Sequence, residues 1–221
     1  MSNGNSASAK KAPVWQGAFI LAALAAFCTV LVAVTHSYTA PLIHANEQAY
    51  LEQSLKPVLG GIEYETELSR SVLNIPIPHE LPGSDAAVIY RIYADGVPAA
   101  ALFIVSARDG FSGPIKILIG VKIDGSITAV RVLQHRETPG LGDMIESSKS
   151  DWLQQFSSTS LTSPIEAFWK IKRDGGEFDQ LTGASVTPRA VIKAVKDTLI
   201  YFDANRDFVF SAIDNDAEEP E

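Results

Sequence analysis

The sequence contains little cysteine and no cluster of positive charge. Cys28 is the only cysteine among 221 residues, which excludes an intramolecular disulfide and any CxxC metal or redox pair. The four histidines, at positions 36, 44, 79 and 135, show none of the i, i+4 or HExxH spacings of a metal site on a helix. The net charge is −8 without a long basic run, whereas nucleic-acid binding needs clustered Lys and Arg. We therefore expect no metal site and no nucleic-acid partner.

Charged side chains are also absent from a long stretch near the N-terminus. No Asp, Glu, Lys or Arg occurs from Ala12 to Asn46, and residues 14–35 are almost wholly apolar. A helix over residues 14–35 would measure about 33 Å, which is enough for a hydrocarbon core of about 30 Å. A cleaved signal peptide is the competing interpretation, but its apolar region usually has only about 7–15 residues. We predict a retained transmembrane helix over residues 14–35.

The residues near the end of this stretch also argue against cleavage. Val32 and Val34 occupy the outer places of a would-be A-x-A site, and the later YTAP (38–41) puts a proline directly after the cut. A lipoprotein signal ending before Cys28 would need a small residue where the chain has Phe27. Retention is therefore the better interpretation.

The charges that flank the span predict its orientation. Lys10 and Lys11 lie just before it, and Glu47 is the first charged residue after it. The positive-inside tendency then places residues 1–13 in the cytoplasm. The chain from residue 47 onward would face the periplasm or the exterior.

Composition divides the remainder of the chain into three parts. Apolar residues at helical spacing over 46–59 predict a stalk helix, and prolines within 73–85 predict an irregular, extended segment. The acidic C-terminus is typical of a disordered tail. The expected organisation is stalk and connector over 36–85, a folded domain over 86–210 and a tail over 211–221.

Four runs rich in β-branched and aromatic residues predict an antiparallel meander with strands at 87–93, 97–105, 115–123 and 127–133. Asp-Gly pairs mark two of the junctions. Every second residue of the run 115–123 is apolar, so one face of the sheet needs a cover. Candidate helices for that cover are 141–149, 151–156 and 188–205, and the last of these carries an apolar stripe at i, i+3, i+4 spacing. The predicted class is α+β: one N-terminal transmembrane helix followed by a twisted antiparallel sheet packed with helices.

Two stretches carry side chains that suggest a ligand. HRETPGLGD (135–143) places glycines and polar groups at a strand-to-helix junction, where an ordinary turn is the simpler interpretation. In FDQLTGASVTPRAV (178–191), Pro188 suits the first helical position and makes Thr187 the predicted N-cap. Ser185 is then a hydroxyl without a structural role, at a helix end that attracts phosphate. The residues alone leave a capped helix start and an anion site as alternatives.

These two stretches, in this order, resemble those of a known family. Together with DGFSGPIKILIGV (109–121), WKIKRDGGEFDQ (169–180), the single span and the final helix, they look like the FMN-binding G subunit of Rnf-type ion-translocating electron transport complexes. The resemblance covers nearly the whole chain. A more distant similarity extends to the C subunit of the sodium-pumping NADH:quinone reductase.

The resemblance implies a set of flavin-binding residues. In the family, a flavin transferase joins FMN through a phosphoester to the threonine of a Ser/Thr-Gly-Ala-Thr motif. Thr182, Gly183 and Ala184 match the first three positions, and Ser185 stands where the family usually has threonine. Thr187 is the alternative acceptor. Asp179 matches the acidic residue before the motif, and the turn expected against the flavin is formed by Glu137, Thr138, Pro139, Gly140 and Leu141.

The function that the resemblance implies is electron relay. The chain would be a single-pass protein of the bacterial inner membrane that carries covalent FMN on the periplasmic side, without a catalytic acid or base of its own. Its partners would be the other membrane subunits of a complex that couples electron flow between ferredoxin and NAD to ion movement, and the flavin transferase during maturation. The alternatives are a cofactor-free anchored binding or assembly module, and a free-standing extracytoplasmic FMN electron carrier or sensor.

Overall fold

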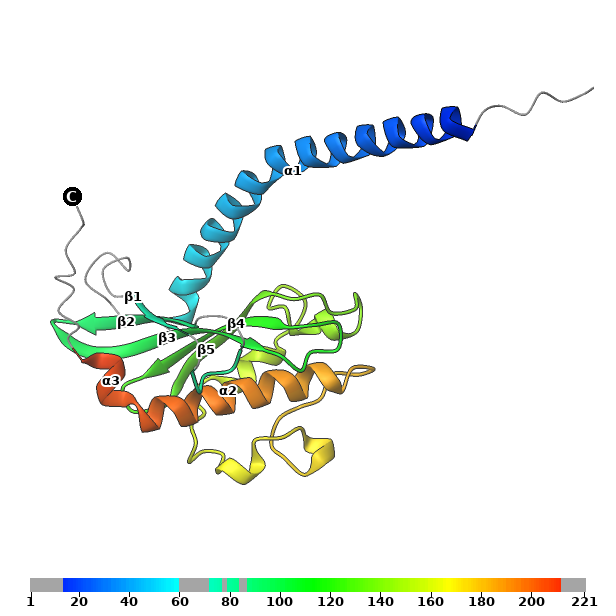
Figure 1. The fold of residues 1–221 in the computed structure, drawn as a ribbon. Coiled ribbons are helices and arrows are strands. Elements are labelled where there is room, and N and C mark those ends of the chain that lie inside the picture. The colour runs from blue at the N-terminus through cyan, green and yellow to red at the C-terminus, as the bar shows by residue number, and fades with distance from the viewer. Residues whose placement is uncertain (1–13, 60–71, 77–78, 84–86, 212–221) are drawn as a thin grey trace, which may run out of the picture. The chain divides into compact units, whose positions relative to one another are not determined.

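The computed structural model describes residues 14–59, 72–76, 79–83 and 87–211 (Figure 1). The predicted tail lies outside these residues except for Ser211, and parts of the predicted connector lie outside them as well. The chain forms two compact units, residues 1–49 and residues 50–221.

The first unit contains most of one long helix, α1 (Val14–Val58). Its apolar part, Gly17–Ile43, is long enough to cross a membrane, which fits the predicted span although it continues beyond residue 35. Hydroxyl groups within this part donate to the carbonyl four residues earlier, as Thr29 does to Ala25 and Thr35 does to Leu31. Such bonds give polar side chains a partner where lipid offers none. The predicted stalk helix belongs to the same element, because α1 is continuous to Val58.

The second unit is built on a five-stranded antiparallel sheet in the order β1-β2-β3-β4-β5. Its strands are β1 (Val72–Ile75), β2 (Ala87–Ala94), β3 (Val97–Ala107), β4 (Ile115–Lys122) and β5 (Ile127–Gln134). The four predicted strands are confirmed to within two residues at each end. The short β1 was not predicted, because the prolines of the connector concealed a four-residue strand that ends just before the first of them.

Glycine-containing turns join the strands of this meander. Asp95 and Gly96 both have positive φ, 51° and 74°, in the two-residue connection from β2 to β3. This is the backbone geometry that favours Asp-Gly in tight hairpins. The second predicted Asp-Gly turn joins β4 to β5, where the Asp124 carboxylate accepts from the backbone N–H of Ser126 at 2.8 Å.

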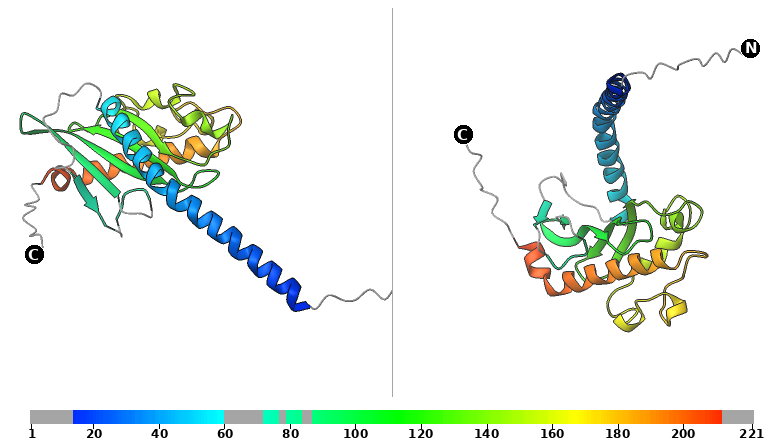
Figure 2. Two further views of the ribbon diagram at one scale, coloured as in Figure 1. Left: turned by 90° about the horizontal axis from the view of Figure 1, so that it is seen from above. Right: turned by 45° about the vertical axis from the view of Figure 1, so that its right-hand side comes forward.

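One face of the sheet is covered by α2 (Val186–Ala204), which lies along it (Figure 2). The predicted apolar stripe of this helix is buried, and so are the alternate β4 residues Ile115, Ile117, Ile119 and Val121. The predicted helices 141–149 and 151–156 are wrong in type. They form only the short 3₁₀ helices η2 (Gly142–Ile145) and η3 (Trp152–Phe156).

The opposite face of the sheet packs against the end of α1. Val58 and Leu59 join a second apolar cluster with Leu102, Ile104 and Leu118. Gly120 in β4 permits this approach, because a Cβ there would lie 2.7 Å from Val58 Cγ1. The predicted α+β class is therefore confirmed, with a sheet that buries apolar residues on both faces.

After η3, the chain from Ser157 to Leu181 contains two further 3₁₀ turns, η4 (Glu166–Phe168) and η5 (Lys172–Asp174). An aromatic cluster holds this segment: Phe156 stacks on Phe178 with ring centroids 4.8 Å apart, and Trp169 lies 4.8 Å from the same Phe178 ring. The short helix α3 (Arg206–Phe210) follows α2.

Candidate functional site

Helix α2 begins two residues earlier than the sequence predicted. Its first helical residue is Val186 and its N-cap is Ser185, so Thr187 is not the N-cap and Pro188 is the third helical residue. Proline is tolerated there for the same reason as at the first position, because none of the first four N–H groups of a helix has an intrahelical partner. The prediction that Thr187 caps the helix is therefore wrong.

Thr187 instead makes a buried contact with Glu137. The Thr187 side chain is 1% exposed, and its hydroxyl donates to Glu137 Oε2 at 2.5 Å. This pair joins the two stretches that the sequence singled out, although fifty positions separate the residues. Sequence reasoning assigned both residues to the site but did not pair them.

Glu137 is itself enclosed by three segments of the chain. Its carboxylate is buried and also accepts the backbone N–H of Ser112 at 3.1 Å through Oε1. A Cβ on Gly142 would lie 2.7 Å from Glu137 Oε2, and one on Gly110 would lie 3.0 Å from Oε1. The absence of a side chain at both glycines is therefore what lets the loops close around the carboxylate.

The two predicted flavin-binding stretches also touch at their exposed surfaces. Gly183 has φ of +80°, and a Cβ on it would lie 2.7 Å from Leu141 Cδ2. The turn opposite is closed by bonds from the N–H groups of Leu141 and Gly142 to the Thr138 carbonyl, at 3.2 and 3.1 Å. The Gly183 backbone therefore lies against the Leu141 side chain, where a residue with a Cβ would not fit.

The structure places the predicted site residues in three environments. Glu137 and Thr187 are buried, Ala184 and Ser185 are half-buried, and the others are exposed: Thr138, Pro139, Gly140, Leu141, Asp179, Thr182 and Gly183. The Ser185 side chain makes no capping hydrogen bond, so its hydroxyl has no structural duty at the helix start.

The start of α2 has the chemistry to hold a phosphate. The positive end of the helix dipole and the unpaired first-turn N–H groups favour an anion there. A phosphoryl group on Ser185 Oγ would sit at the position from which a capping side chain normally reaches those N–H groups. The residues present at the start of α2 therefore fit a phosphate-linked ligand.

Three exposed apolar side chains, which were not predicted from the sequence, lie in the segments that meet at the Glu137–Thr187 contact or next to them in the chain. Phe111 is 70% exposed, Val186 43% and Met144 38%. Phe111 adjoins Ser112, which donates to Glu137, and Val186 adjoins Ser185, so these side chains lie on the segments that meet at the site. Leu141, which is 42% exposed, is a fourth such side chain.

Asp179 lies on an exposed part of the preceding loop. Its carboxylate pairs with Lys172 at 2.6 Å, and this hydrogen bond raises the pKa of Lys172. The Asp179 backbone is fixed by Trp152 Nε1, which donates to its carbonyl at 2.7 Å, and by Gln155 Oε1, which accepts its N–H at 2.7 Å. The structure thus holds Asp179 at the surface by its backbone and leaves its carboxylate accessible.

A chain of hydrogen bonds links the turn at Glu137 to Glu146, Lys149 and Asp143. His135 Nδ1 accepts the Glu137 N–H at 3.0 Å, so the ring carries its hydrogen on Nε2, which lies 2.9 Å from Glu146 Oε1. Lys149 donates to Glu146 at 2.6 Å and to Asp143 at 2.8 Å. Its hydrogen bonds lower the pKa of Asp143 and of Glu146, and they raise the pKa of Lys149 itself.

Replacing Lys149 by Met should destabilise the chain in a pH-dependent way. Asp143 and Glu146 have lower pKa values in the folded state than in the unfolded state, where these are about 4. Their contribution to the free energy of unfolding is therefore present above the unfolded-state pKa values and disappears as the pH falls through the folded-state pKa values. Since the pKa of Lys149 is raised, the contribution of Lys149 to the free energy of unfolding persists until the pH rises through this raised pKa. The free energy of unfolding of the full chain in detergent should therefore differ more between wild type and Lys149→Met at pH 7 than at pH 3. Equal differences at the two pH values would contradict this account. The control is Lys170→Met, because Lys170 is exposed and lacks an ion-pair partner among the described residues.

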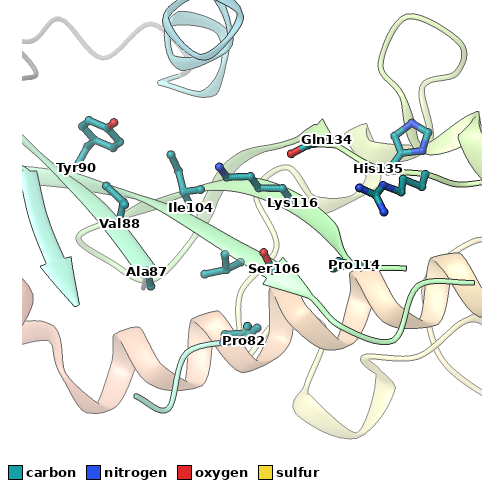
Figure 3. A pocket seen from close by; sticks show the side chains of 13 residues that line it. Pro82, Ala87, Val88, Tyr90, Ile104, Ser106, Pro114, Lys116, Gln134 and His135 are labelled. Carbon is teal, nitrogen blue, oxygen red and sulfur yellow. The ribbon is translucent and has the colours of Figure 1, made fainter. Parts of the chain in front are cut away.

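A separate pocket lies on the sheet face opposite α2 (Figure 3). It measures about 430 Å³, and its lining includes Tyr90, Ile104, Lys116 and Arg136. None of the predicted flavin-binding residues lines it. Within the described part of the chain there is also no group of three or more His, Cys, Asp or Glu side chains that could hold a metal.

Comparison with known families matches both parts of the chain. The family described as FMN-binding domain matches residues 110–200, which include both site stretches. The family described as RnfG N-terminal region matches residues 2–58.

Curated relatives align over most of the chain. The G subunit of the ion-translocating oxidoreductase complex of Vibrio atlanticus is 42% identical over 84% of this chain and 88% of its own length. The proteins of the same name from Shewanella baltica and Pseudomonas aeruginosa are 38% and 39% identical, over 91% and 90% of this chain and 95% and 94% of their own lengths. Among solved structures, NqrC of Shewanella oneidensis is 17% identical, with a TM-score of 0.41 over 67% of this chain and 80% of its own.

Proposed function

Because this chain belongs to the family of G subunits of ion-translocating oxidoreductase complexes, we propose that it relays electrons in such a complex through FMN attached to Ser185. Membership in the family and the FMN-binding domain make it a flavoprotein subunit of an electron transport complex. The proposal adds the covalent bond, the acceptor residue, the exchange between ferredoxin and NAD, and the side of the membrane.

The observation that carries the proposal is the free hydroxyl of Ser185 at the start of α2. It has no capping bond and lies two residues after the exposed Gly183, whereas the Thr187 hydroxyl is buried and donates to Glu137. Of the two candidate acceptors, Ser185 is therefore the one that a transferase can reach.

The attachment requires little of the chain itself. A flavin transferase would bring a flavin dinucleotide to Ser185; the Oγ–phosphorus bond would form as the pyrophosphate bond breaks, with AMP leaving and the hydroxyl proton passing to a base of the transferase. The first-turn N–H groups of α2 would then hold the phosphoester oxygens. Bound FMN supplies the one- or two-electron chemistry, and the protein supplies tethering and orientation.

The charges that flank the span support the proposed side of the membrane. Lys10 and Lys11 precede the apolar span Gly17–Ile43, and no lysine or arginine follows until Lys56. The positive-inside tendency therefore favours a cytoplasmic N-terminus and a periplasmic flavin domain, with α1 holding the protein in the inner membrane.

A single gel experiment tests attachment and side together. The chain made with an active flavin transferase should give a band that fluoresces as flavin after denaturing electrophoresis, and the same chain made without transferase should not. Protease added outside intact spheroplasts should remove that band, and protease should leave a cytoplasmic marker intact. A colourless chain in the presence of transferase would favour the cofactor-free module, and a protected band would reverse the orientation.

A second candidate is a free-standing FMN electron carrier. Its discriminating observation is co-purification: a chain extracted in mild detergent should bring other redox subunits with it if it belongs to a complex, and should come alone if it does not.

A further inference from the structure

The Glu137–Thr187 hydrogen bond joins the two site stretches at a buried position. Glu137 is 5% exposed and Thr187 is 1% exposed, and both are polar side chains that cost free energy to bury unless they are paired. The carboxylate accepts from Thr187 Oγ1 and from the Ser112 N–H, so both of its oxygens are partnered. The fold thus keeps a buried carboxylate at the start of α2.

The position of Thr187 determines what this contact can do. As the second residue of α2, Thr187 brings the carboxylate to the positive end of the helix through a side chain rather than through a backbone N–H. The first-turn N–H groups therefore stay available for another anion. The start of the helix is held on the turn of Glu137, and the Ser185 hydroxyl, two residues away, is left free.

The same contact separates two chemically similar hydroxyls. A carboxylate only accepts hydrogen bonds, so the hydroxyl of Thr187 donates its one hydrogen to Glu137. The Ser185 hydroxyl makes no capping bond and is half-buried. One hydroxyl of the motif is committed to the interior, and the other is presented at the surface.

We propose that Glu137 and Thr187 are positioning residues for flavin attachment, which fix the first turn of α2 so that Ser185 Oγ faces the transferase. This inference rests on the proposed function of Ser185. It gives Glu137 a role inside the protein rather than a contact with the flavin ring, and it removes Thr187 from the candidate acceptors.

The test compares variants that remove or retain one hydrogen bond. Thr187→Val removes the hydroxyl at nearly constant shape, Thr187→Ser retains it, and Glu137→Gln leaves an amide that can accept only one of the two donors. The matched control is Thr198→Val, because Thr198 is a fully buried threonine of the same helix whose hydroxyl bonds only to the Ala194 carbonyl. All are prepared as the flavin-free full chain in detergent and treated with transferase and flavin adenine dinucleotide.

At a temperature where every variant is folded, Thr187→Val and Glu137→Gln should slow attachment by about tenfold or more, since a misplaced reacting group loses rate steeply. Thr187→Ser and Thr198→Val should stay within about twofold of wild type. The double variant Glu137→Gln/Thr187→Val should be no slower than the slower single variant, because both remove one contact. Unchanged rates for Thr187→Val, or an equal loss for Thr198→Val, would overturn the proposal.

Hydrogen exchange of the flavin-free chain separates this proposal from the proposed function. The amides of residues 183–187 should exchange faster in Thr187→Val than in wild type, and they should be unchanged in Thr198→Val. Wild-type protein that accepts no flavin would refute attachment at Ser185, and unchanged exchange in Thr187→Val would overturn the positioning role by itself.

Discussion

A Ser185→Ala chain is expected to insert and fold but to carry no covalent flavin, and a complex assembled with it should lose its electron-transfer activity entirely. Alanine removes the hydroxyl that would receive the phosphoester, and it leaves the helix start otherwise unchanged because Ser185 makes no capping bond. The loss should therefore appear in flavin content and activity while the amount of assembled complex stays close to wild type.

The matched variant for this result is Ser185→Thr. It keeps a nucleophilic hydroxyl group and adds the methyl group of threonine, which is the residue that the resembled family usually has at this position. It should retain flavin and activity, whereas Ser185→Ala should not. Flavin or activity retained in Ser185→Ala would refute Ser185 as the acceptor. Loss only in Thr187→Ala would move the acceptor to Thr187, against its burial and its bond to Glu137.

Of the substitutions proposed for this chain, Phe156→Ala should reduce the free energy of unfolding most. The expected loss is about 3–5 kcal/mol, as is typical of buried aromatic side chains. Phe156 is fully buried and contacts Trp152, Trp169 and Phe178, with ring centroids 4.8–6.3 Å away. Urea unfolding of the full chain in detergent measures the effect.

The control for this prediction lies in the same segment. Phe168 is 45% exposed, and Phe168→Ala should change the free energy of unfolding by about 0.5 kcal/mol or less. Equal effects of the two substitutions would show that the aromatic cluster does not hold the segment. A further consequence concerns Asp179, whose carbonyl is held by the neighbouring Trp152: Phe156→Ala should also lower flavin attachment if the transferase reads Asp179.

Much of the fold was predictable because its signals are local. The period-two runs located β2 to β5 and the apolar stripe located α2. The type of η2 and η3 was not predictable. Both are closed by short-range bonds, such as Glu146 N–H to the Asp143 carbonyl, within segments whose apolar residues would also suit an α-helix. The packing of the end of α1 on the second sheet face was not predicted for a different reason. Gly120 indicates the close approach of Val58 only when the structure shows the two residues side by side.

The site was predictable as two stretches but not as one arrangement. Residues 137–141 and 182–185 were both chosen from the sequence, and the contact of Leu141 with Gly183 brings them together. The role of Thr187 was wrong because Pro188 fits the third helical position as well as the first. Its partner Glu137 lies fifty residues away, and no local pattern reports a contact at that separation.

The central claim, FMN on Ser185, is tested most directly by peptide mass spectrometry of the chain extracted from membranes. Trypsin should release residues 174–189, DGGEFDQLTGASVTPR, which contains all three hydroxyl residues of the motif. We predict that this peptide is heavier by one FMN less one water, that N-terminal fragments reaching Ser185 but not Thr187 carry the whole increment, and that N-terminal fragments ending before Ser185 carry none. An unmodified peptide, or an increment on a fragment that contains Thr182 or Thr187 but not Ser185, would contradict the account.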